Sequence, residues 1–162
     1  MSARPPNPFR YFEDYQPGMI VDCGEVSASE TEMIAFARLY DPQPMHIDPA
    51  AARSSPFGGL IASGWQTAAL TMRLVVANYL SAEANIASPG LEELRWLCPV
   101  RPGDRLTVRV SVVEARRSRS KPLTGVVTSL VEVSNQKGEP VMSLRPVNLM
   151  RCRPRTPVRG EE

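Results

Sequence analysis

Several features that mark particular protein classes are scarce in this sequence. Its 162 residues carry a net charge of only +2, which predicts no strong attraction to nucleic acid or to a membrane surface. Cys23, Cys98 and Cys152 stand far apart without CxxC or Cys/His ligand spacing, so no metal site is expected. The odd cysteine count, with an N-terminus that has no apolar signal-peptide segment, favours reduced thiols in a cytoplasmic protein.

Uninterrupted apolar runs are also lacking. The best candidate, residues 60–80, is a poor membrane span because four residues interrupt it: Gly64, Gln66, Arg73 and Asn78. Its apolar side chains fall on nearly all sides of a helix, which predicts a buried helix about 30 Å long. Trp65, Met72 and Leu74 are interpreted as core residues or as the wall of a tunnel beside this helix. The turn signal ASPG, residues 87–90, should end this helix.

The remaining pattern predicts a strand, a helix and then a meander of strands. Residues 19–28 are rich in strand formers, and Ser29 has capping-box spacing before a helix at about residues 31–40. Pro42 ends that helix, and Pro49 suits the first position of a short helix. Four more strands are expected near residues 91–100, 106–112, 124–134 and 141–151, with Pro146 placing part of the last at an edge or bulge.

This order predicts an α+β fold in which an antiparallel sheet covers one long helix. The outer face and edges of such a sheet remain open, and dimerisation is a natural way to cover them. The length suits one domain over residues 9–151. Proline-rich residues 1–8 are expected to form a flexible arm, and residues 152–162 a flexible basic tail.

His46 is the only histidine, and it lies in the proline-rich stretch DPQPMHIDP, residues 41–49. The prolines are expected to prevent a helix between Asp41 and His46 and to fix a stiff turn that brings the two side chains together. Such a pair can hold one water and move a proton to or from it. No GxSxG motif or nearby cysteine offers a nucleophile, so activated water suits the pair better than an acyl-enzyme does.

A structural interpretation of the same stretch stays open. Asp48 is expected to cap the short helix that begins at Pro49, since aspartate is common at that position. Asp41 can be a turn residue, and His46 can be a loop histidine that either aspartate satisfies.

The second candidate element is FGGLIASGW, residues 57–65, in which small residues let a ligand approach the backbone. Gly64 stands near the start of the long helix, where free N–H groups can face an oxyanion such as a thioester carbonyl gaining enolate character. Alternatively, Gly64 lets the helix pack tightly against a strand. Gly58 and Gly59 are interpreted as turn formers.

The stretches FARLYDPQPMHIDPAAA, FGGLIASG and ELRWLCPVRPGD together resemble the MaoC-like dehydratases, the (R)-specific enoyl-CoA hydratases of the hotdog fold. The resemblance implies that Asp41 and His46 activate water and that the N–H of Gly64 polarises the thioester carbonyl. It implies hydration of a trans-2-enoyl-CoA to a 3-hydroxyacyl-CoA, or the reverse dehydration. It also implies a homodimer or higher homo-oligomer, and no cofactor beyond the coenzyme A of the substrate.

This sequence departs from the family pattern at four positions. Leu39 and Tyr40 precede Asp41 where Ser or Thr and then Gly are usual, and we expect Tyr40 to add bulk at the mouth of the site. Gln43 replaces a shorter asparagine, and Ser63 replaces a histidine or glutamine. Gln43 and Ser63 are therefore candidate supporting residues for the dyad.

Two other functions stay open. An acyl-CoA thioesterase would direct the water to the carbonyl carbon, but hotdog thioesterases more often use a carboxylate on the long helix, and residues 65–80 contain none. A non-catalytic acyl-binding or assembly subunit is the second alternative, motivated by Tyr40 and Gln43. The basic residues Arg116, Arg117, Arg119 and Lys121 form either a solvated loop or a site for the phosphates of coenzyme A.

Overall fold

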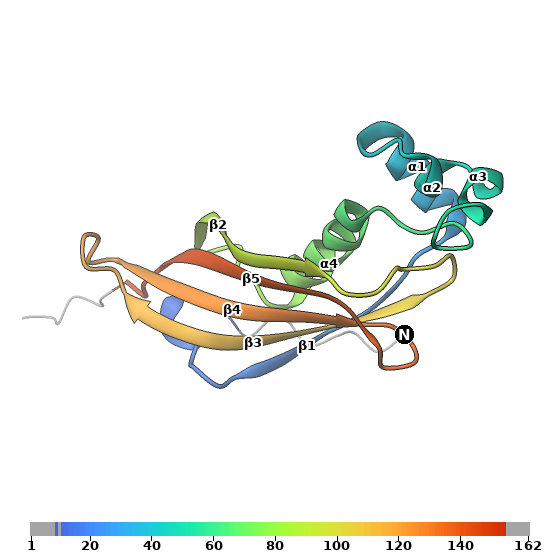
Figure 1. Ribbon diagram of the computed structural model, residues 1–162. Coiled ribbons are helices and arrows are strands. Elements are labelled where there is room, and N and C mark those ends of the chain that lie inside the picture. The colour runs from blue at the N-terminus through green and yellow to red at the C-terminus, as the bar shows by residue number, and fades with distance from the viewer. Residues whose placement is uncertain (1–8, 10, 155–162) are drawn as a thin grey trace, which may run out of the picture.

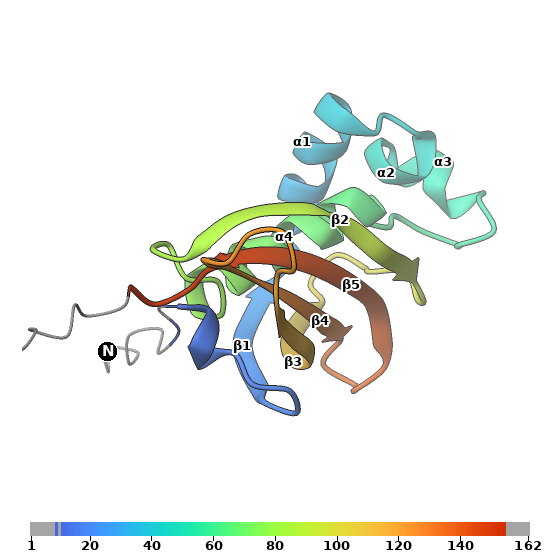
Figure 2. The ribbon, with the colours of Figure 1, turned by 90° about the vertical axis from the view of Figure 1, so that its left-hand side faces the viewer.

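The computed structural model describes Phe9 and residues 11–154. A five-stranded antiparallel sheet has the strand order β1-β3-β4-β5-β2. Figures 1 and 2 show it curving around helix α4 (Gly64–Asn78), which confirms the predicted α+β arrangement. The strands are β1 (Ile20–Ser27), β2 (Asn85–Trp96), β3 (Arg105–Arg117), β4 (Thr124–Ser134) and β5 (Pro140–Arg151).

Strand β3 shows why the sheet forms. Its residues at positions 106, 108, 110 and 112 are buried, and those between them face outward, as the period-2 pattern predicted. Asn78, at the end of α4, donates to the backbone carbonyl of Cys23 at 2.9 Å, which ties the helix to β1. The core therefore lies between α4 and the concave face of the sheet.

Strand β2 begins earlier than predicted, at Asn85, so the ASPG segment is part of a strand. The prediction that it was only a turn is wrong because β2 is an edge strand, where a proline has no ladder partner on its open side. Register shifts on both sides of Ala87 and between Leu91 and Glu93 accommodate the irregular residues. Strand β2 ends at Trp96, whose side chain lies beside Gly64 at the start of α4.

Pro146 does not make β5 an edge strand, because β5 lies between β4 and β2. The alternative expectation, a local irregularity, is what the structure shows. The pairing of β5 with β4 passes from Val147 directly to Leu144, and the β2 register shifts one residue beyond Leu91, the partner of Pro146. Proline has no N–H to donate, and the pairing between β4 and β5 is interrupted at this position.

The helices follow the predicted order, with two additions, η1 (Phe12–Asp14) and α2 (Pro44–Ile47). After η1, a short 3-10 helix, come α1 (Glu30–Tyr40), α2 and α3 (Pro49–Arg53). Ser29 caps α1 by accepting from the Glu32 N–H, and Asp48 caps α3 by accepting from Ala50 and Ala51, as predicted. Helix α2 contradicts the expectation that the prolines prevent a helix there. Pro44 starts it, since proline is well suited to the first helical position.

Helix α4 is shorter than residues 60–80, and it is not buried on all sides. Residues 60–63 form the segment that leads into it, and Trp65, Met72 and Val76 are about half exposed. No helix among residues 11–154 is long and apolar enough to cross a bilayer. An apolar stripe of α4 therefore faces outward in the single chain.

The folded chain continues past Arg151. Cys152 is buried, and the backbone N–H of Arg153 donates to Glu13 at 2.8 Å, so these residues pack beside η1. Cys23, Cys98 and Cys152, all within the described residues, form no disulfide. The predicted arm, residues 1–8, and residues 155–162 of the predicted tail lie outside the described residues.

Candidate active site

The candidate site lies where α1, α2 and α3 meet the first turn of α4, at one end of the sheet (Figure 1). Asp41 is the C-terminal cap residue of α1, and His46 is carried by α2. Pro42 keeps α1 from continuing, and Pro44 starts α2 immediately afterwards. Two short helical ends, rather than an extended loop, thus present the two side chains to each other.

Asp41 is held by two hydrogen bonds. Nε2 of Gln43 donates to Oδ1 at 2.7 Å, and Oγ of Ser63 donates to Oδ2 at 2.7 Å. These donors, first Gln43 and then Ser63, lower the pKa of Asp41 below its ordinary value, and the nearby His46 ring acts in the same direction. Partial burial opposes them but does not prevail. Asp41 is therefore a fixed carboxylate that remains ionised at neutral pH.

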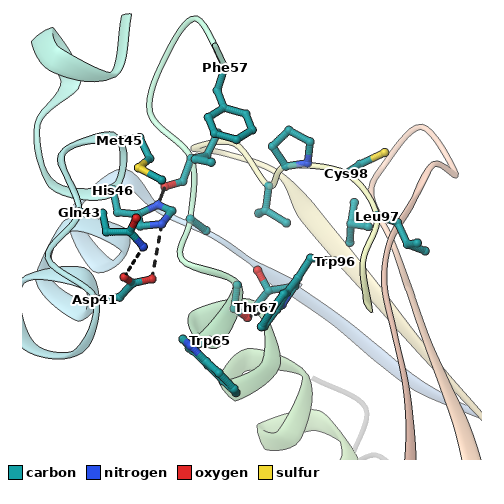
Figure 3. A pocket seen from close by; sticks show the side chains of 16 residues that line it. Asp41, Gln43, Met45, His46, Phe57, Trp65, Thr67, Trp96, Leu97 and Cys98 are labelled. Carbon is teal, nitrogen blue, oxygen red and sulfur yellow. Dashed lines mark hydrogen bonds and ion pairs between the residues drawn. The ribbon is translucent and has the colours of Figure 1, made fainter. Parts of the chain in front are cut away.

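His46 is buried, and its Nδ1 lies 2.9 Å from the backbone carbonyl of Ile61. A carbonyl only accepts hydrogen bonds, so this contact places the ring proton on Nδ1 in the neutral imidazole. Nε2 then carries the lone pair, and it lies 3.5 Å from Oδ2 of Asp41 (Figure 3). The carboxylate and Nε2 are both acceptors, so one water between them can donate a hydrogen to each.

Ser63 and Gly64 join this pair to helix α4. Ser63 is fully buried and is the N-terminal cap, since its Oγ also accepts from the Trp65 N–H at 3.2 Å. Gly64 is the first helical residue, and its N–H has no hydrogen-bond partner among residues 9 and 11–154. A free N–H at a helix start is suited to a developing negative charge. Ser63 therefore orients Asp41 and this donor together.

Trp96 was not predicted as a site residue, although it forms one wall. Its indole Nε1 donates to the backbone carbonyl of Gly64 at 2.9 Å. A Cβ on Gly64 would lie 2.4 to 2.8 Å from the indole ring, closer than real contacts allow. Gly64 thus packs tightly against a strand residue, and its N–H stays without a partner among the described residues. No local pattern reveals a contact across 32 residues.

A cavity of about 430 Å³ opens in front of these groups. Asp41, His46 and Gly64 all line it, together with Gln43. The remaining wall is mostly apolar, with side chains from residues 57–67, β2 and the segment after it (Figure 3). Polar groups at one end of an apolar cavity are typical of a small-molecule site.

Two other sets of candidate residues lie away from the cavity. Tyr40 does not line the cavity; its ring packs beside Phe36 and is mostly exposed. Residues 116–121 lie around the β3–β4 connection, at the end of the sheet far from α1–α3 in Figure 1. Arg116 pairs there with Glu114, and Arg117 pairs with Glu13. The structure of the single chain does not bring Arg116, Arg117, Arg119 or Lys121 to the cavity.

Known proteins are similar to this chain in sequence and in architecture. A family model described as a MaoC like domain matches residues 14–135. The crystal structure of a MaoC-like dehydratase from Rhodospirillum rubrum superposes with a TM-score of 0.85 at 40% identity, covering 91% of this chain and 100% of that one. The uncharacterized protein YdeM of Bacillus subtilis is 30% identical over 125 residues, 77% of this chain and 87% of that protein.

A further relative carries an activity in its name. The 3-hydroxyacyl-thioester dehydratase Z of Mycobacterium tuberculosis is 33% identical over 110 residues, which cover 67% of this chain and 73% of that protein. The matched residues 14–135 contain the Asp41–His46 pair, Ser63, Gly64 and Trp96. The chain belongs to the MaoC-like dehydratase family.

Proposed function

We propose that the protein adds water to a trans-2-enoyl-CoA to give a 3-hydroxyacyl-CoA, and catalyses the reverse dehydration. The observation that carries the proposal is the convergence of the Asp41–His46 pair and the free Gly64 N–H on one cavity. The name of the M. tuberculosis relative, a 3-hydroxyacyl-thioester dehydratase, supports the same reaction class.

The proposed mechanism assigns a role to each group. The water donates its hydrogens to Asp41 and His46 and directs its oxygen at the β-carbon of the enoyl group. The hydrogen-bonded Asp41 has a lowered pKa and is a weak base, so Nε2 of His46 takes the proton. The Gly64 N–H stabilises the enolate that forms at the thioester oxygen. His46 then returns the proton to the α-carbon, which completes the addition of one water.

Hydration and thioester hydrolysis differ in the carbon that the water attacks. Hydration adds the water to the β-carbon, and hydrolysis adds it to the thioester carbonyl carbon. Helix α4 (Gly64–Asn78) carries no Asp or Glu that could act in hydrolysis. The assay therefore follows loss of the conjugated enoyl-thioester absorbance of crotonyl-CoA and release of free thiol in parallel. We expect the absorbance to fall without thiol release, and mass spectrometry to show a gain of one water.

Asp41→Ala and His46→Ala should each lower kcat/KM by about 10²- to 10⁴-fold, the range for a positioned acid or base. Asp48→Ala is the matched control, because Asp48 lies in the same segment but only caps α3. It should cost about 1 kcal/mol of stability and leave turnover near the wild-type value. Full turnover in both dyad variants would refute the mechanism, and thiol release would instead assign a thioesterase.

We also infer that the active form is a homodimer. Strand β2 is an edge strand, and most of its residues are exposed. Ile86 and Leu91 of β2 add to the exposed stripe of α4, and the two elements lie side by side in Figures 1 and 2. A second copy that covers this face would remove both the open edge and the apolar exposure. Light scattering should give twice the chain mass, and a monomer at assay concentration would contradict the inference.

A further inference from the structure

A second cavity, of about 130 Å³ and almost entirely apolar, adjoins the site cavity. The two linings follow in the same order along helix α4: Gly64 lines the site cavity, Ala68 and Met72 line the second, and Trp65 lines both. Trp65 therefore stands at the junction of the two cavities.

The sheet shows the same order. On β2, Trp96 lines the site cavity and Leu94 lines the second cavity. On β5, Val141 lines the site cavity and Leu144, the register partner of Leu94, lines the second. Three elements thus agree that the cavities lie end to end between α4 and the sheet, with the start of the second cavity just beyond the tryptophans.

The two indoles form a partition at this point. The Trp65 and Trp96 rings meet edge to face, with centroids 5.2 Å apart, beside the first turn of α4 (Figure 3). Trp96 is fixed by its hydrogen bond to Gly64 and by its close contact with the Gly64 backbone. Among the described residues no hydrogen bond holds the Trp65 indole, so Trp65 is the partner whose ring can move.

The volume of the second cavity indicates how long an alkyl chain can extend beyond the two tryptophans. A dry cavity of about 150 Å³ holds a benzene, six carbon atoms, so 130 Å³ suits about five carbons of an alkyl chain. Under the proposed function, the first three acyl carbons lie at Gly64 and the dyad. We propose that Trp65 sets the acyl chain length: a butyryl-sized group fits the site cavity, and a chain of about eight carbons binds well only when the Trp65 ring is displaced.

The test uses ligands that bind without reacting. Calorimetric titration with saturated butyryl-CoA and octanoyl-CoA gives the ratio of the two dissociation constants. We expect Trp65→Ala to raise the preference for octanoyl-CoA about tenfold, and Trp65→Phe to raise it less, because a smaller ring opens less of the partition. Adding Ala68→Phe to Trp65→Ala fills the second cavity and should return the ratio to the wild-type value.

Arg73→Ala is the control, since Arg73 is an exposed polar residue of the same helix, outside both cavities and outside the apolar stripe. It should leave the ratio unchanged. A Trp65→Ala ratio within twofold of wild type, a gain that survives Ala68→Phe, or binding of neither ligand would each overturn the chain-length role. Saturated thioesters cannot be hydrated, so the expected ratios in a protein inactive on enoyl-CoA would reject the proposed reaction and keep Trp65 in this role.

Discussion

Both ends of helix α4 hold networks of polar groups. The network at the C-terminal end is fully hydrogen-bonded within the protein, whereas the one at the N-terminal end leaves two groups facing a cavity. At the C-terminal end, the Tyr79 hydroxyl shares a hydrogen bond with Ser129 at 2.7 Å, and the Tyr15 hydroxyl donates to the Tyr79 carbonyl and accepts from the Ser81 N–H. All of these residues are buried, and burial raises the pKa of Tyr79 to about 12. This network is closed and packed under the aromatic ring of Phe9.

At the N-terminal end, two polar groups that face the cavity have no hydrogen-bond partner among the described residues. Asp41 and the ring proton of His46 are satisfied by protein groups, whereas Nε2 of His46 and the Gly64 N–H point to a cavity. Satisfied buried polar groups stabilise a fold, and groups left to a cavity are available to a ligand. The comparison predicts that changes at the first end act on activity and changes at the second end on stability.

Among the changes that compare the two ends, Gly64→Ala should have the largest effect, and it tests the N-terminal end. The added Cβ collides with the Trp96 indole, so either the indole or the start of α4 must shift, and the N–H moves with it. We expect kcat/KM for crotonyl-CoA to fall by about 10²-fold or more, as for loss of one oxyanion donor. Thermal unfolding, followed by circular dichroism, should show that the variant is still folded.

The double variant Gly64→Ala/Trp96→Ala separates packing from chemistry at this position. Removing the indole gives the Cβ room while the backbone N–H is kept. A partial recovery of kcat/KM relative to Gly64→Ala is expected. Wild-type activity in Gly64→Ala alone would contradict the close contact on which the comparison of the two ends depends.

Tyr15→Phe should have the next largest effect and tests the C-terminal end. It deletes one buried hydroxyl that makes two hydrogen bonds, which costs about 1–3 kcal/mol of unfolding free energy. Tyr40→Phe is the matched control, because the Tyr40 side chain is mostly exposed and should change stability by less than about 0.5 kcal/mol. Urea unfolding measures both, and a stable Tyr15→Phe enzyme with low activity would reverse the assignment of the two ends.

The contrast also explains what could be predicted from sequence. Local patterns sufficed for β3, for the Ser29 and Asp48 caps and for the proximity of Asp41 and His46, because each depends on residues close in the chain. The extension of β2 through Pro89 depends on its place at the sheet edge, and the Trp96–Gly64 contact joins residues that are 32 positions apart in the chain. Helix α2 was missed because Pro44 was interpreted as a helix breaker although it occupies the first helical position.

The smallest expected effect concerns the pH dependence of Asp41. Because its pKa is lower in the folded protein than in the unfolded chain, its ionisation adds stability above the unfolded pKa of about 3.9. That contribution is lost as the pH falls through the folded value. Gln43→Ala and Ser63→Ala each remove a donor, so the pKa of Asp41 should rise toward its ordinary value in both.

If the carboxylate of Asp41 is needed in turnover, the acidic limb of the kcat/KM profile should move to higher pH in both variants. The shift should be larger for Gln43→Ala, since Gln43 is the stronger influence on this pKa. A purely structural role for Gln43 and Ser63 would lower the whole profile without moving the limb. Because Ser63 also caps α4, Ser63→Ala should in addition lower the plateau, which Gln43→Ala should not do to the same extent. Identical profiles in both variants and the wild type would show that Asp41 contributes only to stability, as the buried tyrosine hydroxyls do at the C-terminal end of α4.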